Sequence, residues 1–351
     1  MLPRLRWRYR TATYNSFSGE IVRFLKLALA APLLAGLAGC KMVVMDPAGD
    51  IAVQQRDLLL LSTGLMLLII VPVIGLTLFF AWKYRASNTA ATYEPDWHHS
   101  TKLEVIVWSI PMAIIMILGT VTWIASHTLD PYRPLSRIAP NRPVAANVKP
   151  LEVDVVALDW KWLFIYPELG VASVNELAAP VDRPIAFKIT ASSVMNSFYV
   201  PALAGQIYAM PGMQTQLHAV VNKPGVYEGF SANYSGAGFS GMHFKFKGLS
   251  DAEFGQWVAS LRAAPAQLTR ADYLQLAKPS ADEPVRRFAG VEPGLFLDIL
   301  DQCVAPGTTC KHGGMPGMNH AEAAKALCKT PPQRVARNDP PRAAGAQIRA
   351  Q

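Results

Sequence analysis

Charged residues are scarce in this chain: only 17% of its 351 residues are Asp, Glu, Lys or Arg, whereas 51% are hydrophobic and the mean hydropathy is +0.19. Such a composition argues against a purely water-soluble globule. Cysteine is also rare, with four in total, and neither a CxxC nor a CxxCH sequence occurs. The chain is therefore neither a disulfide-built scaffold nor a carrier of covalently attached haem.

An excess of positive charge is also lacking outside the N-terminal region. The formal net charge is +8, but six basic residues and Glu20 place +5 of it in residues 1–39, which leaves 8 − 5 = +3 for the remainder. A chain so nearly balanced does not offer the basic surface that phosphate backbones require. We therefore expect no nucleic-acid partner, and we interpret the basic start as part of a targeting region.

An export signal is predicted at residues 24–40, FLKLALAAPLLAGLAGC, because a basic stretch precedes an apolar run that ends in small residues. Its last four residues, Leu37 to Cys40, resemble a bacterial lipobox, in which the signal is cut before the cysteine and that cysteine is lipidated. The alternative is an ordinary cysteine near the membrane. Lipidation of Cys40 would place the following residues outside the cytoplasm.

Two uncharged runs, Leu58–Trp82 and Val105–Ala125, are each long enough to cross a hydrocarbon layer of about 30 Å as a helix. They predict a helical hairpin in the bilayer. The connecting loop carries three basic residues against two on the short segment before the first run, so the loop should be cytoplasmic. Everything after residue 126 then lies outside.

Glu104, at the edge of the second run, has two interpretations. Thr101 and Glu104 have the spacing of a capping box, which would satisfy free amides at a helix start. An acidic residue at a membrane edge is also a candidate for proton handling. The two roles are compatible.

The part of the chain after a proline-rich linker is rich in short β-type stretches separated by Pro, Gly and Asn, which predicts a small antiparallel sandwich or barrel. These stretches are LEVDVVAL, PIAFKIT, QTQLHAVV, GVYEGFS and MHFKFKG. A helix should follow, since Ser250 and Glu253 form a second capping-box pattern. One face of that helix carries Phe254, Trp257, Val258 and Leu261.

Several longer motifs resemble subunit II of the haem-copper terminal oxidases, most closely the bacterial cytochrome bo-type ubiquinol oxidases. They are WHHSTKLEVIVWSIP, HTLDPYRPL, ALDWKWLFIYPE, VMNSFYVP and QIYAMPGMQ. The resemblance implies a bacterial inner-membrane protein whose C-terminal domain is cupredoxin-like and periplasmic. The predicted organisation is a lipoprotein signal peptide (1–39), a periplasmic N-terminal segment (40–57), a transmembrane hairpin (58–126), a linker (127–150), the cupredoxin-like domain (151–249), a helical C-terminal arm (250–305) and a flexible tail (306–351).

Relatives that oxidise cytochrome c hold a dinuclear copper centre in this domain, built from two Cys, two His, a Met and a glutamate carbonyl. The matching positions here are Asn196, Ser231, Asn233, Ser235, Phe239 and Met242. Only the methionine is a side-chain ligand, so we expect no metal and instead hydrogen bonds among the polar replacements. The β-domain also has no cysteine, and we expect its histidines, His218 and His243, to be ordinary strand residues.

Without copper, the resemblance implies that ubiquinol, bound mainly by the large subunit I, delivers electrons there directly. Haems and catalytic copper would belong to that partner, with smaller membrane subunits completing the complex. Trp160, Trp162 and Tyr166 are then expected to serve packing. Glu104 matches the family's glutamate at the cytoplasmic entrance of a proton path, which favours proton handling over capping.

The tail combines soft metal donors with possible disulfide partners: Cys303, Cys310, His312, Met315, Met318, His320 and Cys328. The three cysteines allow three single pairings, and the sequence does not choose among them. The favoured hypothesis is a structural and proton-path subunit of a quinol oxidase. The alternatives are a copper-binding lipoprotein that acts through this tail, and a cytochrome c oxidase subunit, which would need His at position 196 and Cys at 231 and 235.

Overall fold

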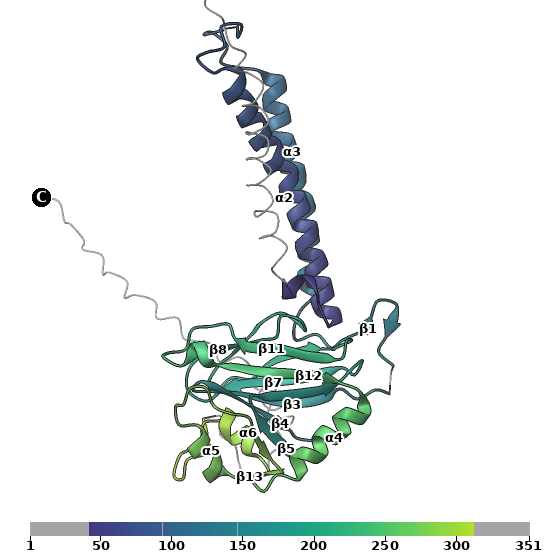
Figure 1. Ribbon diagram of the computed structural model, residues 1–351, viewed down its shortest axis with the longest axis vertical. Coiled ribbons are helices and arrows are strands. Elements are labelled where there is room, and N and C mark those ends of the chain that lie inside the picture. Colours follow the sequence, from purple (N-terminus) through teal and green to yellow (C-terminus); the bar gives the residue numbers. More distant parts are fainter. Residues whose placement is uncertain (1–41, 93, 146, 312–351) are drawn as a thin grey trace, which may run out of the picture.

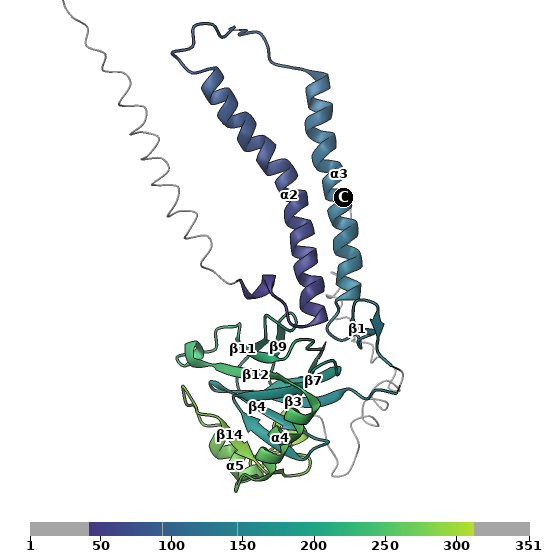
Figure 2. The ribbon, with the colours of Figure 1, turned by 45° about the vertical axis from the view of Figure 1, so that its right-hand side comes forward.

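The computed structural model describes residues 42–311 apart from 93 and 146, and it shows a helical hairpin standing on a β-domain (Figure 1). A short 3-10 helix, η1 (Val43–Met45), precedes the hairpin helices α2 (Asp50–Lys83) and α3 (Thr101–Thr128). The loop between the two helices lies at the end of the hairpin farthest from the β-domain (Figure 2).

Both helices are long and apolar enough to cross a membrane, as predicted, but α2 begins eight residues before the predicted span. The extra turns lie against the β-domain, where Asp50 and Ala52 are buried. The segment predicted as 40–57 is therefore partly helical. In the most apolar window of each helix almost no side chain is buried, so each helix presents an uncovered apolar surface.

In addition to the linker after α3, the segment before α2 attaches the hairpin to the β-domain. The Ala48 amide donates to the Ala202 carbonyl at 2.8 Å, and the Asn222 amide donates to the Ala48 carbonyl at 2.7 Å. A Cβ atom at Gly49 would lie 2.4 Å from the Val220 carbonyl oxygen, so only glycine fits there. The chain just before α2 therefore packs closely against the backbone of the β-domain.

The β-domain is a sandwich of two sheets. The six-stranded sheet has the order β10 (Thr215–Ala219), β7 (Ile185–Ala191), β3 (Leu151–Leu158), β4 (Lys161–Tyr166), β5 (Val171–Val174), β14 (Arg286–Phe288); the five-stranded sheet has the order β6 (Glu176–Pro180), β12 (His243–Leu249), β11 (Gly225–Ser231), β8 (Asn196–Tyr199), β9 (Ile207–Ala209). The sandwich was predicted, but a purely antiparallel one was wrong, because β3 with β7 and β6 with β12 pair in parallel. The linker adds a small hairpin of β1 (Arg137–Ala139) and β2 (Arg142–Pro143).

Aromatic rings fill the space between the sheets. Phe198 stacks on Phe244 with centroids 5.4 Å apart, and Trp162 meets both rings edge-on. Strand β4 is buried along its whole length because its outer face is covered as well. That double burial explains why its sequence, KWLFIY, lacks the alternation that would have identified it as a strand.

The C-terminal arm packs on the sandwich in two parts: α4 closes the core between the sheets where β5 and β6 lie, and the segments after it cover the outer face of the six-stranded sheet. It contains α4 (Asp251–Arg262), β13 (Gln267–Leu268), α5 (Arg270–Leu276), β15 (Gly290–Val291) and α6 (Leu295–Leu300). The capping box of Ser250 and Glu253 at α4 is formed, and the predicted apolar face of that helix is buried. The arm is less helical than predicted, since β14 joins the six-stranded sheet and β13 pairs with β15.

Candidate functional site

The candidate site lies at one end of the five-stranded sheet, where two loops meet. Residues 192–195 lead into β8, and residues 232–242 join β11 to β12 through the 3-10 helix η2 (Phe239–Gly241). Because β8 and β11 are antiparallel neighbours, with Ser231 opposite Phe198, the start of one strand lies beside the end of the other. All six positions that the resemblance identified are on these strand ends and loops.

Asn196 and Ser231 form the buried centre of the site, with exposures of 1% and 3%. The Ser231 hydroxyl lies 3.1 Å from Asn196 Oδ1 and 3.2 Å from the Asn233 carbonyl oxygen, and it accepts from the Ser197 amide at 3.4 Å. A hydroxyl has one proton, so the two acceptors share it. The Asn196 amide group donates to the Val194 carbonyl at 3.2 Å. This is the hydrogen bonding expected from the sequence.

The second half of the loop differs from the expectation. Asn233 donates to the carbonyls of Met195 and Tyr234, each at 3.2 Å. The Ser235 hydroxyl, however, is buried without a hydrogen-bond partner among the described residues, so the prediction that all four polar side chains bond together was wrong there. The backbone of Ser235 is used instead, since its carbonyl accepts from the Trp160 indole at 3.1 Å.

Phe239 and Met242 complete the set. The Phe239 ring packs edge-on against Tyr234 at 5.6 Å, and Met242 is fully buried, with its carbonyl accepting from the Ser231 amide. Amide, hydroxyl and phenyl groups do not suit copper, which prefers thiolate, thioether and imidazole ligands, so these residues do not fit a dinuclear copper centre. Within residues 42–311, no cluster of three or more His, Cys, Asp or Glu could hold a metal ion.

Trp160 closes the loop from the side. Cβ atoms built on Gly236 and Gly238 would lie 2.9 and 2.5 Å from its ring, so the indole rests directly on the loop backbone. Trp162 and Tyr166 are fully buried in the sandwich core. The expected packing role of the three aromatic residues agrees with these positions.

Glu104 lies far from this site, at the loop end of the hairpin. Its carboxylate is 55% exposed and contacts His99 Nδ1 at 2.7 Å. The predicted capping box is not formed: the N-cap is Ser100, which makes no side-chain cap. Helix α3 begins one residue too early for Thr101 to serve as N-cap, so Glu104 is the fourth helical residue rather than the third.

The two histidines of the β-domain have the ordinary surroundings that were expected. His243 is exposed and contacts the Ser240 carbonyl and Glu228. His218 is half-buried, and burial lowers the pKa of its imidazole.

The cysteine pairing left open by the sequence is resolved for one pair. Cys303 and Cys310 form a disulfide, which removes two of the three tail thiols from metal binding. The remaining predictions for the termini, namely the signal peptide with lipidation of Cys40 and the donors His312, Met315, Met318, His320 and Cys328, lie outside the described residues.

Comparison with known proteins gives two matches to family models. Residues 152–248 match the periplasmic domain of cytochrome c oxidase subunit II, and residues 262–307 match the aromatic-rich motif of these oxidases. The chain is 52% identical over 266 residues to cytochrome bo(3) ubiquinol oxidase subunit 2 of Pseudomonas putida, covering 76% of this chain and 82% of that protein. It is 50% identical over 300 residues to the Pseudomonas aeruginosa protein of the same name, covering 86% of each.

The chain belongs to the ubiquinol oxidase subunit 2 family. The resemblance drawn from the motifs is thereby confirmed, as is the prediction that the chain works as part of an oxidoreductase complex. The periplasmic domain of subunit II of cytochrome oxidase from Bradyrhizobium japonicum aligns with 25% identity and a TM-score of 0.30, covering 31% of this chain and 91% of that one.

A buried charge cluster around Glu176 was missed by sequence reasoning. Glu176 is 5% exposed and accepts from the Trp257 indole at 2.6 Å, from Lys247 at 2.9 Å and from Arg287 at 2.9 Å. Burial opposes ionisation of Glu176, but the hydrogen bonds from Lys247 and Trp257 hold its pKa below the usual range. The cluster joins α4 and β14 of the arm to the five-stranded sheet, and these partners are too far apart in sequence for any local pattern to reveal.

Proposed function

We propose that this chain is a copper-free, structural subunit II of a proton-pumping oxidase that transfers electrons from ubiquinol to O2. The observation that carries the proposal is the direct contact between Asn196 and Ser231, two polar groups at positions where copper-binding relatives need His and Cys. Their mutual hydrogen bond uses the atoms that would otherwise face a metal. Electrons would then pass from ubiquinol to haems and copper in subunit I without entering this chain.

The placement of the chain follows from the same proposal. The hairpin would span the bacterial inner membrane, the β-domain would face the periplasm, and subunit I and smaller subunits would cover the exposed apolar faces of α2 and α3. The two helix surfaces are too apolar to remain in water, which supports such partners. Gentle solubilisation and capture of this chain should therefore recover a haem-containing complex that consumes oxygen with a quinol. A haem-free chain would favour the lipoprotein alternative.

Copper analysis tests the absence of a redox centre. The chain ending at Gln302, which excludes the tail donors, is purified in detergent, loaded with copper and dialysed. We expect no retained copper. The matched control carries Asn196→His, Ser231→Cys, Ser235→Cys and Phe239→His, which restore imidazole and thiolate ligands and should retain metal. Stoichiometric copper in the unaltered sequence would refute the proposal.

We also propose that Glu104 is the chain's chemical contribution, as the entrance of a proton path. Its carboxylate is more than half exposed at the loop end of the hairpin and touches the imidazole of His99. Both groups exchange protons with water, and a carboxylate at the membrane edge can collect protons for an intramembrane relay. The capping box of Thr101 and Glu104 is not formed, which supports this role over that of a helix cap.

A pair of substitutions tests this role. Glu104→Ala should slow quinol-dependent turnover of the assembled oxidase while leaving the haem content per complex unchanged. Glu94→Ala is the matched control, because Glu94 is an exposed carboxylate in the same loop. Equal turnover in both variants would eliminate a proton role for Glu104, whereas a loss of assembled complex with normal specific activity would assign it to structure.

A further inference from the structure

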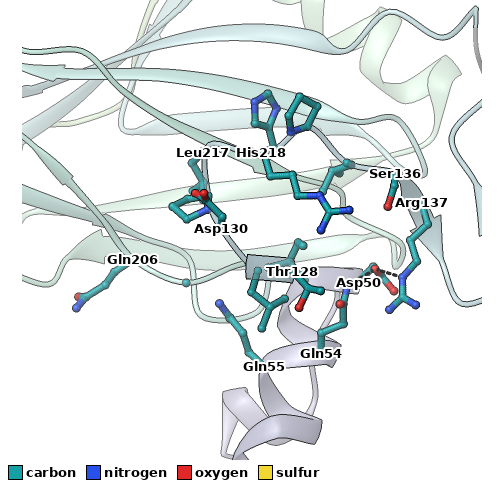
Figure 3. A pocket seen from close by; sticks show the side chains of 17 residues that line it. Asp50, Gln54, Gln55, Thr128, Asp130, Ser136, Arg137, Gln206, Leu217 and His218 are labelled. Atoms are coloured by element: carbon teal, nitrogen blue, oxygen red, sulfur yellow. Dashed lines mark hydrogen bonds and ion pairs between the residues drawn. The ribbon is translucent and has the colours of Figure 1, made fainter. Parts of the chain in front are cut away.

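A polar pocket of about 290 Å³ lies where the hairpin joins the β-domain (Figure 3). Its walls come from the start of α2, the end of α3, the linker and β10. The linker part is the motif HTLDPYRPL, which the proposed function does not use. The polar side chains drawn in Figure 3 include Asp50, Gln54, Gln55, Asp130, Arg137 and His218.

The wall of the pocket formed by the end of α3 lies at the depth of the lipid headgroup layer, and the Asp50 wall lies just outside that layer, if the hairpin spans the membrane as proposed above; the inference rests on that placement. Thr128 is three residues beyond Ala125, the end of the uncharged run, and Asp50 is eight residues before Leu58. At about 1.5 Å per helical residue, these walls lie about 4 and 12 Å outside the hydrocarbon. Headgroups occupy roughly the first 5 to 8 Å on each side.

The charges in the pocket are balanced but only partly paired. Asp50 accepts from Arg137 at 2.9 Å and from Gln54 at 2.7 Å, so this ion pair is internally neutral. Asp130 and Arg133 also line the pocket, and neither forms an ion pair within the described part of the chain. The pocket therefore offers one uncommitted carboxylate and one uncommitted guanidinium.

Each of these two side chains makes one hydrogen bond to the backbone. Asp130 Oδ1 accepts from the Tyr132 amide at 2.9 Å, which leaves its second oxygen for another donor. Among the described residues, the Arg133 side chain donates only to the His127 carbonyl, at 3.5 Å, so most of its five N–H groups remain available. In addition, Asp50 Oδ1 is buried without a hydrogen-bond partner among the described residues, although Asp50 as a whole is 2% exposed. A positively charged ligand group nearby would stabilise this oxygen.

We propose that the pocket binds the headgroup of a phospholipid that carries a phosphate and a primary ammonium group. The Arg133 guanidinium matches the phosphate, which it can hold through two parallel hydrogen bonds. The Asp130 carboxylate accepts from the ammonium group. A choline headgroup has no N–H to donate, and a glycerol headgroup has no positive charge, so neither can make a charge-assisted hydrogen bond to Asp130.

Photo-cross-linking in the intact oxidase tests the proposal. The delipidated complex is placed in nanodiscs of phosphatidylcholine with a minor fraction of a phosphatidylethanolamine that carries a diazirine at the glycerol end of one chain. Cross-links are mapped by mass spectrometry to residues 127–137. The same lipid with a choline or glycerol headgroup gives the comparison. Quinol-dependent oxygen consumption of each sample shows separately whether the proposed function holds.

We expect the ethanolamine lipid to label this segment about tenfold more than the other two lipids. The reason is that it alone makes a charge-assisted hydrogen bond to Asp130, and one such bond changes affinity by about tenfold. Asp130→Asn should remove that preference, and Asn at 130 keeps the acceptor for the Tyr132 amide. Arg133→Gln should lower labelling by all three lipids, because each of them carries the phosphate. Arg142→Gln and Asp182→Asn are matched controls, because these residues pair with each other outside the pocket. They should label normally.

Two results would overturn the proposal in an oxidase that is otherwise active. Equal labelling by all three lipids would show that the charged pair selects no headgroup. Complete displacement of the label by soluble glycerophosphoethanolamine at the concentration of the lipid would assign the pocket to a soluble phosphate ester instead of a membrane lipid.

Discussion

Replacement of Asp154 by Asn should make the protein more stable, and the gain should grow with pH. Asp154 lies on β3 beneath the C-terminal arm, is 6% exposed, and its Oδ1 has no hydrogen-bond partner among the described residues. Burial raises the pKa of this carboxyl to about 7, against a smaller opposing effect of Lys188 and a small additional rise from Glu152. A charged Asp154 is therefore unfavourable in the folded domain.

The size of the effect follows from the two pKa values. In the unfolded chain Asp154 ionises near 3.8, so below that pH it is neutral in both states and contributes no cost. Between about 4 and 7 the unfolded chain releases the proton and the folded chain keeps it, so stability falls as pH rises. Above pH 7 the full cost is reached, about 4 kcal/mol at 1.36 kcal/mol per pH unit. At pH 5 it is only about 1.6 kcal/mol.

The assay is the apparent melting temperature of the purified oxidase, followed by tryptophan fluorescence at pH 5 and pH 8. Asp154→Asn should gain about 3 kcal/mol more at pH 8 than at pH 5, roughly 6 to 12 °C for a unit of this size. Asp251→Asn, which changes an exposed carboxylate at the start of α4, should show no such trend. A gain that is the same at both pH values, or a loss at both, would refute the reasoning.

Three further substitutions probe other parts of the fold. Glu176→Ala should destabilise the chain by about 1 to 3 kcal/mol, because it leaves the buried Trp257 indole without its acceptor and removes the shared partner of Lys247 and Arg287, and chemical denaturation of the purified complex would measure this. Gly238→Ala should cost about 1 to 3 kcal/mol by forcing the Trp160 ring off the loop, visible as a shift in tryptophan emission. Cys303→Ser should free the Cys310 thiol for alkylation without loss of turnover.

Much of the architecture could be predicted because its signals are local. The two apolar runs and the Ser250 capping box depend on neighbouring residues, and the structure agrees with them. The parallel pairing of β3 with β7 and the burial of β4 on both faces could not be predicted, since each depends on segments far along the chain. The failed cap at Thr101 shows the limit of spacing rules, because a shift of one residue in the helix start changes every role.

The candidate site followed a similar division. The identities at positions 196 and 231 already excluded copper-type donors, and their contact followed from the pairing of β8 with β11. The unpartnered hydroxyl of Ser235 and the packing of Trp160 on Gly236 and Gly238 could not be predicted, because both depend on the backbone conformation of the loop between β11 and β12. The pocket beside the hairpin was equally hidden, since four separate segments build it.

The close packing at Gly49 restricts how the β-domain can move relative to the hairpin. A domain joined to the helices by one linker could rotate freely. This β-domain is attached at two points, namely the segment that leads into α2 and the segment that follows α3. Rotation of the β-domain about the long axis of the hairpin would have to break the hydrogen bonds that Ala48 makes with Ala202 and Asn222. The β-domain therefore keeps one orientation relative to the two helices, so a surface formed jointly by the helices and the sandwich has a fixed shape.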